Sequence, residues 1–318
     1  MTRKGRILLA ILLVFVVIVA ACAVTVAVLF SRTFEQLGLG DKPLVNGKSL
    51  ADMQLEQYTP KQVYPLAKSL FRDNRSLVKY APEASDLAAV DNAFEYTSID
   101  FVWGVQYSNL IYRSASFAKS TQLVLSDKQL CALLNNVVKQ APDDVLLSTS
   151  AEILAYLGSK QIKDILDILQ QYDVTIEQIR LLDKDGTSHM ELLISLDISA
   201  YTQDASVAFA KKLNPRIYAY IDYRLDVSDT GIVNLSNPQL SVNGKDVEIS
   251  QAVLDGLFVA LDSSDISTKT VTQGISAFIA VVLEHVGRVG TETQYGMCGV
   301  NMAKRTIRFE CDGLVIFD

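Results

Sequence analysis

Residues 216–227, which read RIYAYIDYRLDV, decide the fold because apolar and polar side chains alternate along them. Ile217, Ile221 and Leu225 belong to one face of this segment, and Asp222 and Arg224 belong to the other. A period of two is typical of a β-strand with one buried face. The stretch therefore predicts a long strand whose apolar side must pack against another layer.

Similar segments on both sides predict an antiparallel meander. Residues 174–182 and 190–198 alternate in the same way and are joined by the turn sequence Asp183-Lys184-Asp185-Gly186. Glycine suits turn positions that need a positive φ. Residues 231–240 follow the central strand after a further turn, and strands are also expected near 99–107, 121–125, 293–300 and 306–317.

Helical patterns supply the layer that these strands need. A capping box at Ser126 and Gln129 predicts a helix that ends near Gln140, and residues 269–286 carry a continuous apolar stripe at helical spacing. The predicted fold class is α+β: an N-terminal transmembrane helix, followed by an ectodomain in which a long, curved antiparallel β-sheet wraps around one or two long helices.

The N-terminal segment predicts a membrane anchor. Residues 7–30 contain no charged side chain, and a helix of that length spans roughly 36 Å at about 1.5 Å per residue, more than the core of a bilayer at about 30 Å. Arg3, Lys4 and Arg6 precede it, which places the N-terminus in the cytoplasm and the bulk of the chain outside the cell membrane. The expected organisation is a cytoplasmic N-terminus (1–6), a signal-anchor (7–30), a juxtamembrane stalk (31–93) and an extracytoplasmic α+β domain (94–318).

Two other interpretations of the N-terminus remain open. A cleaved signal peptide would have a shorter apolar region, of about 7–15 residues. Val19-Ala20-Ala21-Cys22 matches the site at which bacterial lipoproteins are lipidated, although eight more uncharged and mostly apolar residues follow Cys22. The length of the apolar run favours an uncleaved single span.

The charge balance excludes one class of partner. The chain has 29 Lys and Arg residues against 36 Asp and Glu residues, for a formal net charge of −7. Nucleic-acid phosphates need a basic surface. We therefore expect no nucleic-acid partner.

The residues that usually carry catalysis or bind metal are sparse. No CxxC pair occurs, and His189 and His285 lie far apart in the sequence, so we expect no metal, no cofactor and no enzymatic activity. His189 is expected at the start of a strand, beside a solvated turn at Asp185-Gly186. The carboxylate pairs Asp143-Asp144 and Asp222 with Asp226 are interpreted as solvated charges rather than glycosidase groups. Cys131 is expected to be a buried small hydrophobe. Cys298 and Cys311 form either a disulfide or two free thiols.

The chain resembles the tubular lipid-binding (TULIP) superfamily, and within it the YpmS-like group of small bacterial membrane-anchored proteins. The resemblance rests on the N-terminal anchor, on Leu125-Ser126-Asp127-Lys128-Gln129-Leu130 at a helix start, on the long strands at 217–242 with the helix after them, and on the core helix beside a terminal hairpin. It covers roughly residues 95–318. The resemblance implies a curved sheet around a long helix, enclosing an apolar groove for a lipid chain, and no catalytic residues.

Two functions follow as hypotheses. The first is a membrane-anchored, non-catalytic protein that binds or shuttles a lipid or another hydrophobic envelope molecule, because a buried acyl chain gains about 0.8 kcal/mol per CH₂. The second is an extracytoplasmic scaffold in cell-envelope assembly with a filled core and unidentified protein partners. If an apolar cavity exists, we expect its lining on the inward strand positions and the long helix: Ile194, Leu196, Ile221, Leu225, Phe278 and Val282.

Overall fold

A computed structural model describes residues 29–43, 47–100, 106–112, 122–140, 174–199, 212–228, 233–260, 267–286, 288–289, 293–294 and 296–310. These residues fall into two compact units. Unit 1 contains the described residues within Met1–Leu77, Ser195–Tyr220 and Gln239–Val271, and unit 2 contains those within Val78–Ile194, Ile221–Pro238 and Thr272–Asp318. Each unit is therefore assembled from three separate stretches of the chain.

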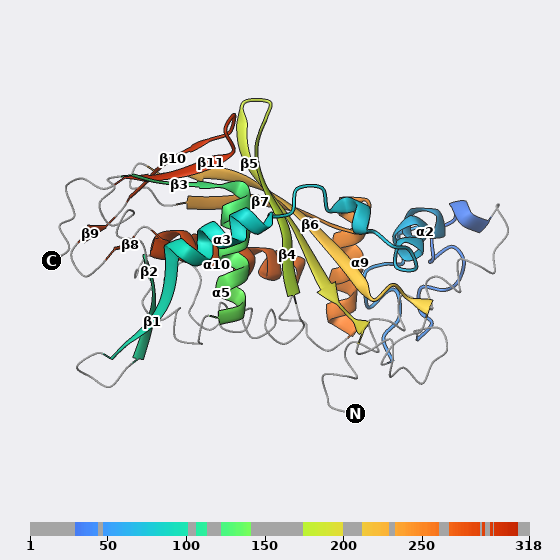
Figure 1. Cartoon of the computed structure of the whole chain (residues 1–318). Helices are drawn as coiled ribbons and strands as arrows, with labels where there is room; N and C mark the ends of the chain where they lie inside the picture. Colours follow the sequence, from blue (N-terminus) through green and yellow to red (C-terminus); the bar gives the residue numbers. More distant parts are fainter. Residues whose placement is uncertain are drawn as a thin grey trace. The chain divides into compact units, whose positions relative to one another are not determined.

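Unit 1 is built around two helices. Helix α2 (Pro60–Ser69) begins with a capping box, in which the Thr59 side chain and the Gln62 side chain each accept a backbone N–H of the other residue. This pairing satisfies two backbone groups that a helix start leaves open. Helix α2 lies beside α9 (Val247–Ala260) (Figure 1). The short 3₁₀ turns η1 (Leu29–Ser31) and η2 (Arg75–Leu77) belong to the same unit.

Gly256 lets α9 approach the loop at residues 53–55. A Cβ at this position would lie 2.9 Å from the carbonyl oxygen of Met53 and 3.1 Å from the Cδ1 atom of Leu55. The first distance is shorter than a carbon and a backbone oxygen tolerate, so a larger residue must displace the loop. Gly256 is itself buried in the helix.

Gly256→Ala is expected to lower the free energy of unfolding by about 1–2 kcal/mol, because overpacking against a backbone carbonyl outweighs the gain of about 1 kcal/mol in helix propensity. Chemical unfolding followed by circular dichroism measures the change. Gln251→Ala, in the same helix, is the control and should change stability by less than about 0.5 kcal/mol. A stabilised Gly256→Ala variant would show that the loop gives way freely.

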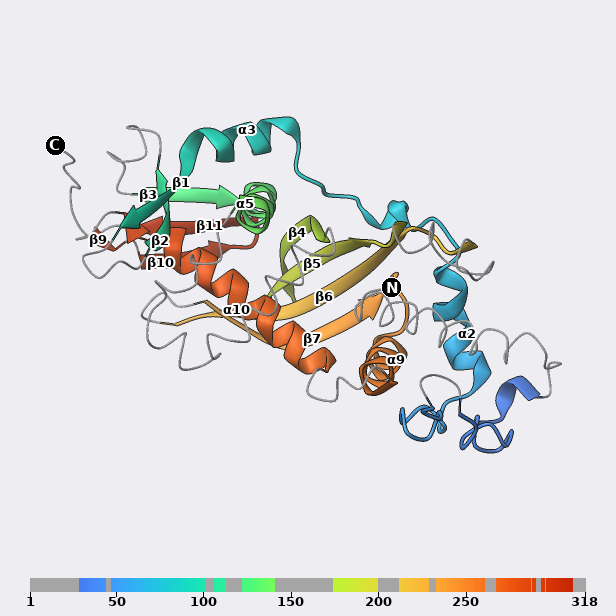
Figure 2. The ribbon, with the colours of Figure 1, turned by 90° about the horizontal axis from the view of Figure 1, so that it is seen from below.

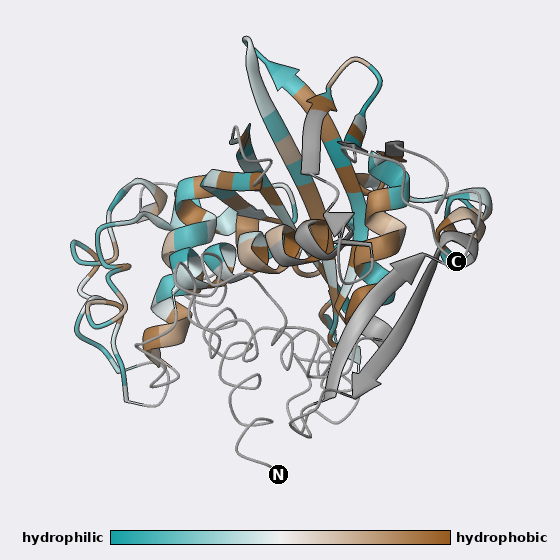
Figure 3. Ribbon diagram, turned by 90° about the vertical axis from the view of Figure 1, so that its left-hand side faces the viewer, coloured by the Kyte–Doolittle hydropathy of each residue, from teal (hydrophilic) through white to brown (hydrophobic). Residues whose placement is uncertain are grey.

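The largest sheet has four strands in the order β4-β5-β6-β7, so each strand neighbours the next one in sequence. Its strands are β4 (Val174–Lys184), β5 (Thr187–Asp197), β6 (Arg216–Val227) and β7 (Val233–Val242). Hydrophobic and hydrophilic residues alternate along the strands of this sheet (Figure 3). The chain passes from one unit to the other within β5, β6 and β7.

Unit 2 also contains three smaller sheets. One is three-stranded, in the order β10-β11-β3, and joins β3 (Gln122–Ser126) antiparallel to β11 (Thr306–Glu310), with β10 (Gly296–Asn301) on the far side of β11. The hairpin of β1 (Phe94–Asp100) and β2 (Gln106–Tyr112) and the short pair β8 (Arg288–Val289) and β9 (Thr293–Gln294) are separate two-stranded sheets.

Three helices of unit 2 accompany these sheets. Helix α3 (Ala84–Ala93) contacts α5 (Asp127–Gln140), which contacts β4. Asn135 of α5 acts like a strand partner for β4, since its Nδ2 donates to the Ile176 carbonyl at 2.7 Å and its Oδ1 accepts from the Ile176 N–H at 2.9 Å. Helix α10 (Thr268–Val286) runs beside β6 (Figure 2), and the buried Tyr223 hydroxyl donates to the Thr272 carbonyl at 2.6 Å.

The α+β composition agrees with the sequence, but the predicted fold class is wrong about the wrapped sheet. In the described part of the chain no long curved sheet encloses a helix; the strands are divided among the separate sheets above. Alternation shows that a strand has one apolar face, but it does not determine which strands pair or how far a sheet curves. Here β3 pairs with β11 instead of extending the meander.

No helix within the described ranges is both long enough and apolar enough to cross a membrane. The predicted transmembrane segment, residues 7–30, lies outside these ranges except for Leu29 and Phe30.

Candidate functional site

Five charged or titratable side chains gather on one face of the four-stranded sheet. They occupy alternate positions of three neighbouring strands, which is why they share a face. We call them the charged cluster: Arg180 and Lys184 of β4, His189 and Glu191 of β5, and Asp222 of β6. All five belong to unit 2.

Lys184 is the centre of the charged cluster. Its Nζ lies 2.8 Å from Glu191 Oε1 and 2.5 Å from Asp222 Oδ2, so one ammonium group joins two carboxylates. The second oxygen of each carboxylate has its own partner. Arg180 Nη1 lies 3.2 Å from Glu191 Oε2, and His189 Nδ1 lies 2.9 Å from Asp222 Oδ1.

The cluster is partly removed from water. The side chains of Glu191 and Asp222 are 8% and 15% exposed, whereas that of Lys184 is 34% exposed. Burial lowers the pKa of Lys184, but its hydrogen bonds to Asp222 and Glu191 outweigh that effect and raise the pKa above 10.5. Lys184 therefore stays protonated at every physiological pH.

This arrangement is suited to holding three strands together. Each carboxylate oxygen of Glu191 and Asp222 already faces a cation or an imidazole, and the nearby positive charges of Lys184 and Arg180 disfavour a metal cation there. Within the described ranges no group of three His, Cys, Asp or Glu residues could hold a metal ion. The cluster is therefore best explained as a structural ion-pair network.

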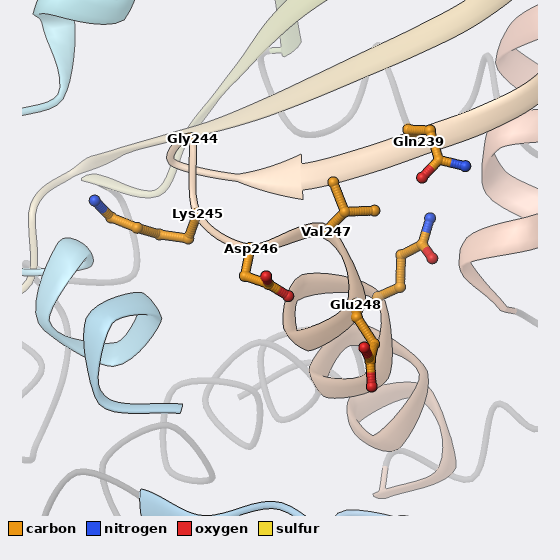
Figure 4. A pocket seen from close by; sticks show the side chains of 7 residues that line it. Gln239, Gly244, Lys245, Asp246, Val247 and Glu248 are labelled. Atoms are coloured by element: carbon orange, nitrogen blue, oxygen red, sulfur yellow. The ribbon is translucent and has the colours of Figure 1, made fainter. Parts of the chain in front are cut away.

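The second feature is a polar pocket in unit 1, where β7 turns into α9. It has a volume of about 690 Å³, is open to solvent and is lined by Gln239, Gly244, Lys245, Asp246, Val247, Glu248 and Gln251 (Figure 4). Carboxamide, carboxylate and ammonium groups predominate in this lining. We call it the polar pocket.

The turn into α9 positions the acidic groups of the polar pocket. Asp246 precedes the helix, and its Oδ1 accepts from the backbone N–H of Ile249 at 3.0 Å. The Tyr58 hydroxyl donates to Glu248 Oε1 at 3.4 Å; burial, and after it the charge of Glu248, raises the pKa of Tyr58. The pocket thus offers fixed polar groups and one small apolar side chain, Val247.

Most of the six residues predicted to line an apolar cavity are buried in the interior of the protein. None of them lines the polar pocket. Ile221 and Leu225 of β6 and Phe278 and Val282 of α10 are at most 2% exposed. Ile194 is also buried, whereas Leu196 is only half-buried. All but Leu196 belong to unit 2. Their role in ligand binding remains a prediction.

The sequence interpretation missed the charged cluster. His189, predicted at the start of a strand beside a solvated turn, lies in β5, but its side chain is only 20% exposed and is bonded to Asp222. The residues of the turn itself, Asp185 and Gly186, have positive φ values. The sequence did contain a signal for the cluster. Arg180 and Lys184 are an even number of residues apart and so lie on one face of their strand, and the same holds for His189 and Glu191 on the next strand.

The other candidate residues are partly outside the described ranges. Cys131 is buried, as predicted, and its thiol donates to the Ile176 carbonyl at 3.2 Å. Burial raises the pKa of this thiol far above its usual range. Cys22, Cys311, Asp143 and Asp144 lie outside these ranges, as do the side chains of Cys298 and His285. Asp226 pairs with Arg224 at 3.2 Å and not with Asp222.

Comparison of the chain with protein-family models, with curated proteins and with solved structures found no match.

Proposed function

We propose that this protein is a membrane-anchored, extracytoplasmic, non-catalytic interaction protein that holds a partner of the cell envelope at its polar surface. The observation that carries the proposal is the contrast between its interior and its pocket. The predicted apolar lining at Ile221, Phe278 and Val282 is tightly buried, whereas the polar pocket is open and hydrophilic. A filled core with an open polar site suits binding at the surface better than enclosure of an acyl chain.

The anchoring part of the proposal rests on sequence. Residues 7–30 have the length and composition of a span, and Arg3, Lys4 and Arg6 favour a cytoplasmic N-terminus. A tether of this kind raises the local concentration of the rest of the chain near other components of the envelope.

The non-catalytic part rests on the charged cluster. An imidazole that acts as a general base needs a positioned nucleophile or water. His189 instead completes a network in which Lys184 already joins both carboxylates. We infer that this network holds the sheet together.

Lipid binding is the second candidate, favoured by the resemblance to the tubular lipid-binding superfamily. Five of the six predicted lining residues are in unit 2, where an acyl chain would have to displace well-packed side chains. Such opening costs free energy because protein interiors are close-packed. This candidate therefore requires a second conformation of unit 2.

Site-specific photo-crosslinking in cells tests the first candidate. A photoreactive amino acid replaces Gln251 in the polar pocket or, as the control, the exposed Lys61 of α2. We expect one discrete protein adduct from position 251, none from position 61, and loss of the adduct in a Glu248→Arg background. Equal labelling at both positions, or no adduct at position 251, would contradict the proposal.

Native mass spectrometry of the full chain, released from detergent micelles, tests the second candidate. A bound lipid in one-to-one ratio that disappears in Ile221→Trp or Phe278→Trp, but persists in the exposed control Val124→Trp, would support lipid binding. A bare protein mass that takes up no added fatty acid or phospholipid would rule it out.

A further inference from the structure

Two guanidinium groups contact one tyrosine ring in unit 2. The Cζ atom of Arg180 lies 4.3 Å from the centre of the Tyr80 ring, and that of Arg305 lies 5.3 Å from it. Both distances are within the range of cation–π contact. Two positive side chains that are far apart in sequence, one on β4 and one just before β11, therefore meet at one aromatic residue.

Both arginines have N–H donors for which the described residues supply no acceptor. Arg180 donates from Nη1 to Glu191, but its Nε is buried and has no hydrogen-bond partner among the described residues. The guanidinium of Arg305 forms no hydrogen bond or ion pair within the described ranges, and its contact there is with the Tyr80 ring. Buried donors are almost always paired in folded proteins, so an orphaned one indicates a missing acceptor.

Backbone contacts hold the Tyr80 segment and Arg305 in place. The buried Gln178 accepts from the backbone N–H groups of Lys79 and Tyr80 at 2.8 and 3.0 Å. Arg305 has a φ of +51° in the turn before β11, and its carbonyl accepts from the Asp127 N–H at 3.0 Å. Groups held in position before binding lose less freedom when a ligand arrives.

The surrounding acidic groups do not neutralise both arginines. Glu191 is shared between Arg180 and Lys184. Asp127 attracts Arg305, but no ion pair between them lies within 4 Å, and burial raises the pKa of Asp127. Lys304, next to Arg305 in sequence, is exposed and adds a further positive charge. This part of the chain therefore offers several N–H donors beside the carboxylates of Glu191 and Asp127, and the buried Oδ2 atom of Asp127 also has no hydrogen-bond partner among the described residues.

We propose that Arg180 and Arg305, arranged around Tyr80, form a binding site for a phosphate group. The planar guanidinium matches phosphate oxygens with two parallel N–H donors, which a lysine cannot do. The phosphate belongs either to a free anion or to the headgroup of an anionic phospholipid. The site lies in unit 2 and does not depend on the proposed function of the polar pocket.

The test is a ³¹P NMR titration of inorganic phosphate into the full chain in maltoside micelles, which themselves contain no phosphate. We expect the phosphate line to broaden with the wild-type protein and the dissociation constant to rise roughly tenfold in Arg305→Gln. Arg305→Lys should be intermediate, because it keeps the charge and loses the planar fork. Arg224→Gln, at an exposed ion pair on the same sheet, is the matched control and should bind like the wild type.

A competition experiment distinguishes a free phosphate anion from a phospholipid headgroup as the natural ligand. If the natural ligand is a lipid headgroup, doping the micelles with phosphatidylglycerol should release inorganic phosphate, whereas diacylglycerol, which lacks phosphate, should not. If phosphatidylglycerol fails to compete, the free anion is the ligand.

Two results would overturn the proposal. One is an unbroadened phosphate line with wild-type protein at millimolar phosphate. The other is an Arg305→Gln variant that unfolds at a lower temperature but binds phosphate as the wild type does, because Arg305 would then serve only to balance Asp127.

Discussion

Replacing Asn243 with alanine is expected to lower the free energy of unfolding by about 3 kcal/mol. Asn243 is 2% exposed and has a φ of +50°. Its Oδ1 accepts from the Tyr218 N–H at 2.9 Å, and its Nδ2 donates to the Ser69 hydroxyl at 3.1 Å. Alanine removes both bonds and keeps a Cβ at a left-handed position, which asparagine adopts more readily than alanine does. Chemical unfolding of the full chain in micelles, followed by circular dichroism, measures the change.

Two further substitutions separate the effect of the lost hydrogen bonds from that of the left-handed backbone conformation. Asn243→Gly relieves the backbone strain and should recover about 1 kcal/mol of the loss, because glycine adopts positive φ freely. Asn243→Asp keeps the acceptor for Tyr218 but introduces a buried charge beside Ser69, so it should be destabilised at neutral pH and less so in acid. Equal stability of the alanine variant and the wild type would contradict this account of the turn.

Replacing Lys184 with methionine is expected to cost about 2 kcal/mol at pH 7. Removing one partner of a fully buried ion pair costs about 3–5 kcal/mol, and we reduce that figure because Lys184 is 34% exposed and partly screened by solvent. The loss arises because Glu191 and Asp222 keep their charges and lose the cation between them. The exposed pair of Arg224 and Asp226 provides the control, and Arg224→Met should cost less than about 1 kcal/mol.

The pH dependence of stability gives this prediction a second readout. Because the pKa of folded Lys184 is raised above 10.5, its contribution is fully present below that pH and is lost as the pH rises through the folded pKa. The wild type should therefore lose stability above about pH 10.5 more steeply than Lys184→Met does. Parallel stability curves for the two proteins in that range would show that the ammonium group contributes nothing to folding.

Local patterns predicted some of the individual elements but not all, since the strand expected near 99–107 does not match β1, which ends at Asp100, or β2, which begins at Gln106. The strand expected at 216–227 is β6 without a change of boundary, and the helix expected at 269–286 begins one residue earlier in α10. The sequence Asn243-Gly244 is typical of a tight turn, and both residues have positive φ. These features depend on neighbouring residues in the chain, so periodicity and turn chemistry are enough to find them.

Pairing between distant strands was not predictable in this way. The residues of β3 and β11 are separated by most of the chain, yet Leu125 lies opposite Ile307 in a sheet of its own. The wrapped sheet was expected because every strand has one apolar face, and that property is the same whether the strands form one sheet or several. The candidate site was missed for the same reason, since each residue of the charged cluster also looks like a solvated charge.

The sequence by itself determined which segments become strands and helices, where the chain turns and which faces are apolar. Only the tertiary structure decided that Lys184 joins Glu191 to Asp222, that Asn243 bonds Tyr218 and Ser69, and that Arg180 and Arg305 meet at Tyr80. The physical reason is the separation along the chain over which each kind of interaction acts. Backbone propensity and hydrophobic period act over a few residues, whereas an ion pair or a buried hydrogen bond depends on which distant strands become neighbours.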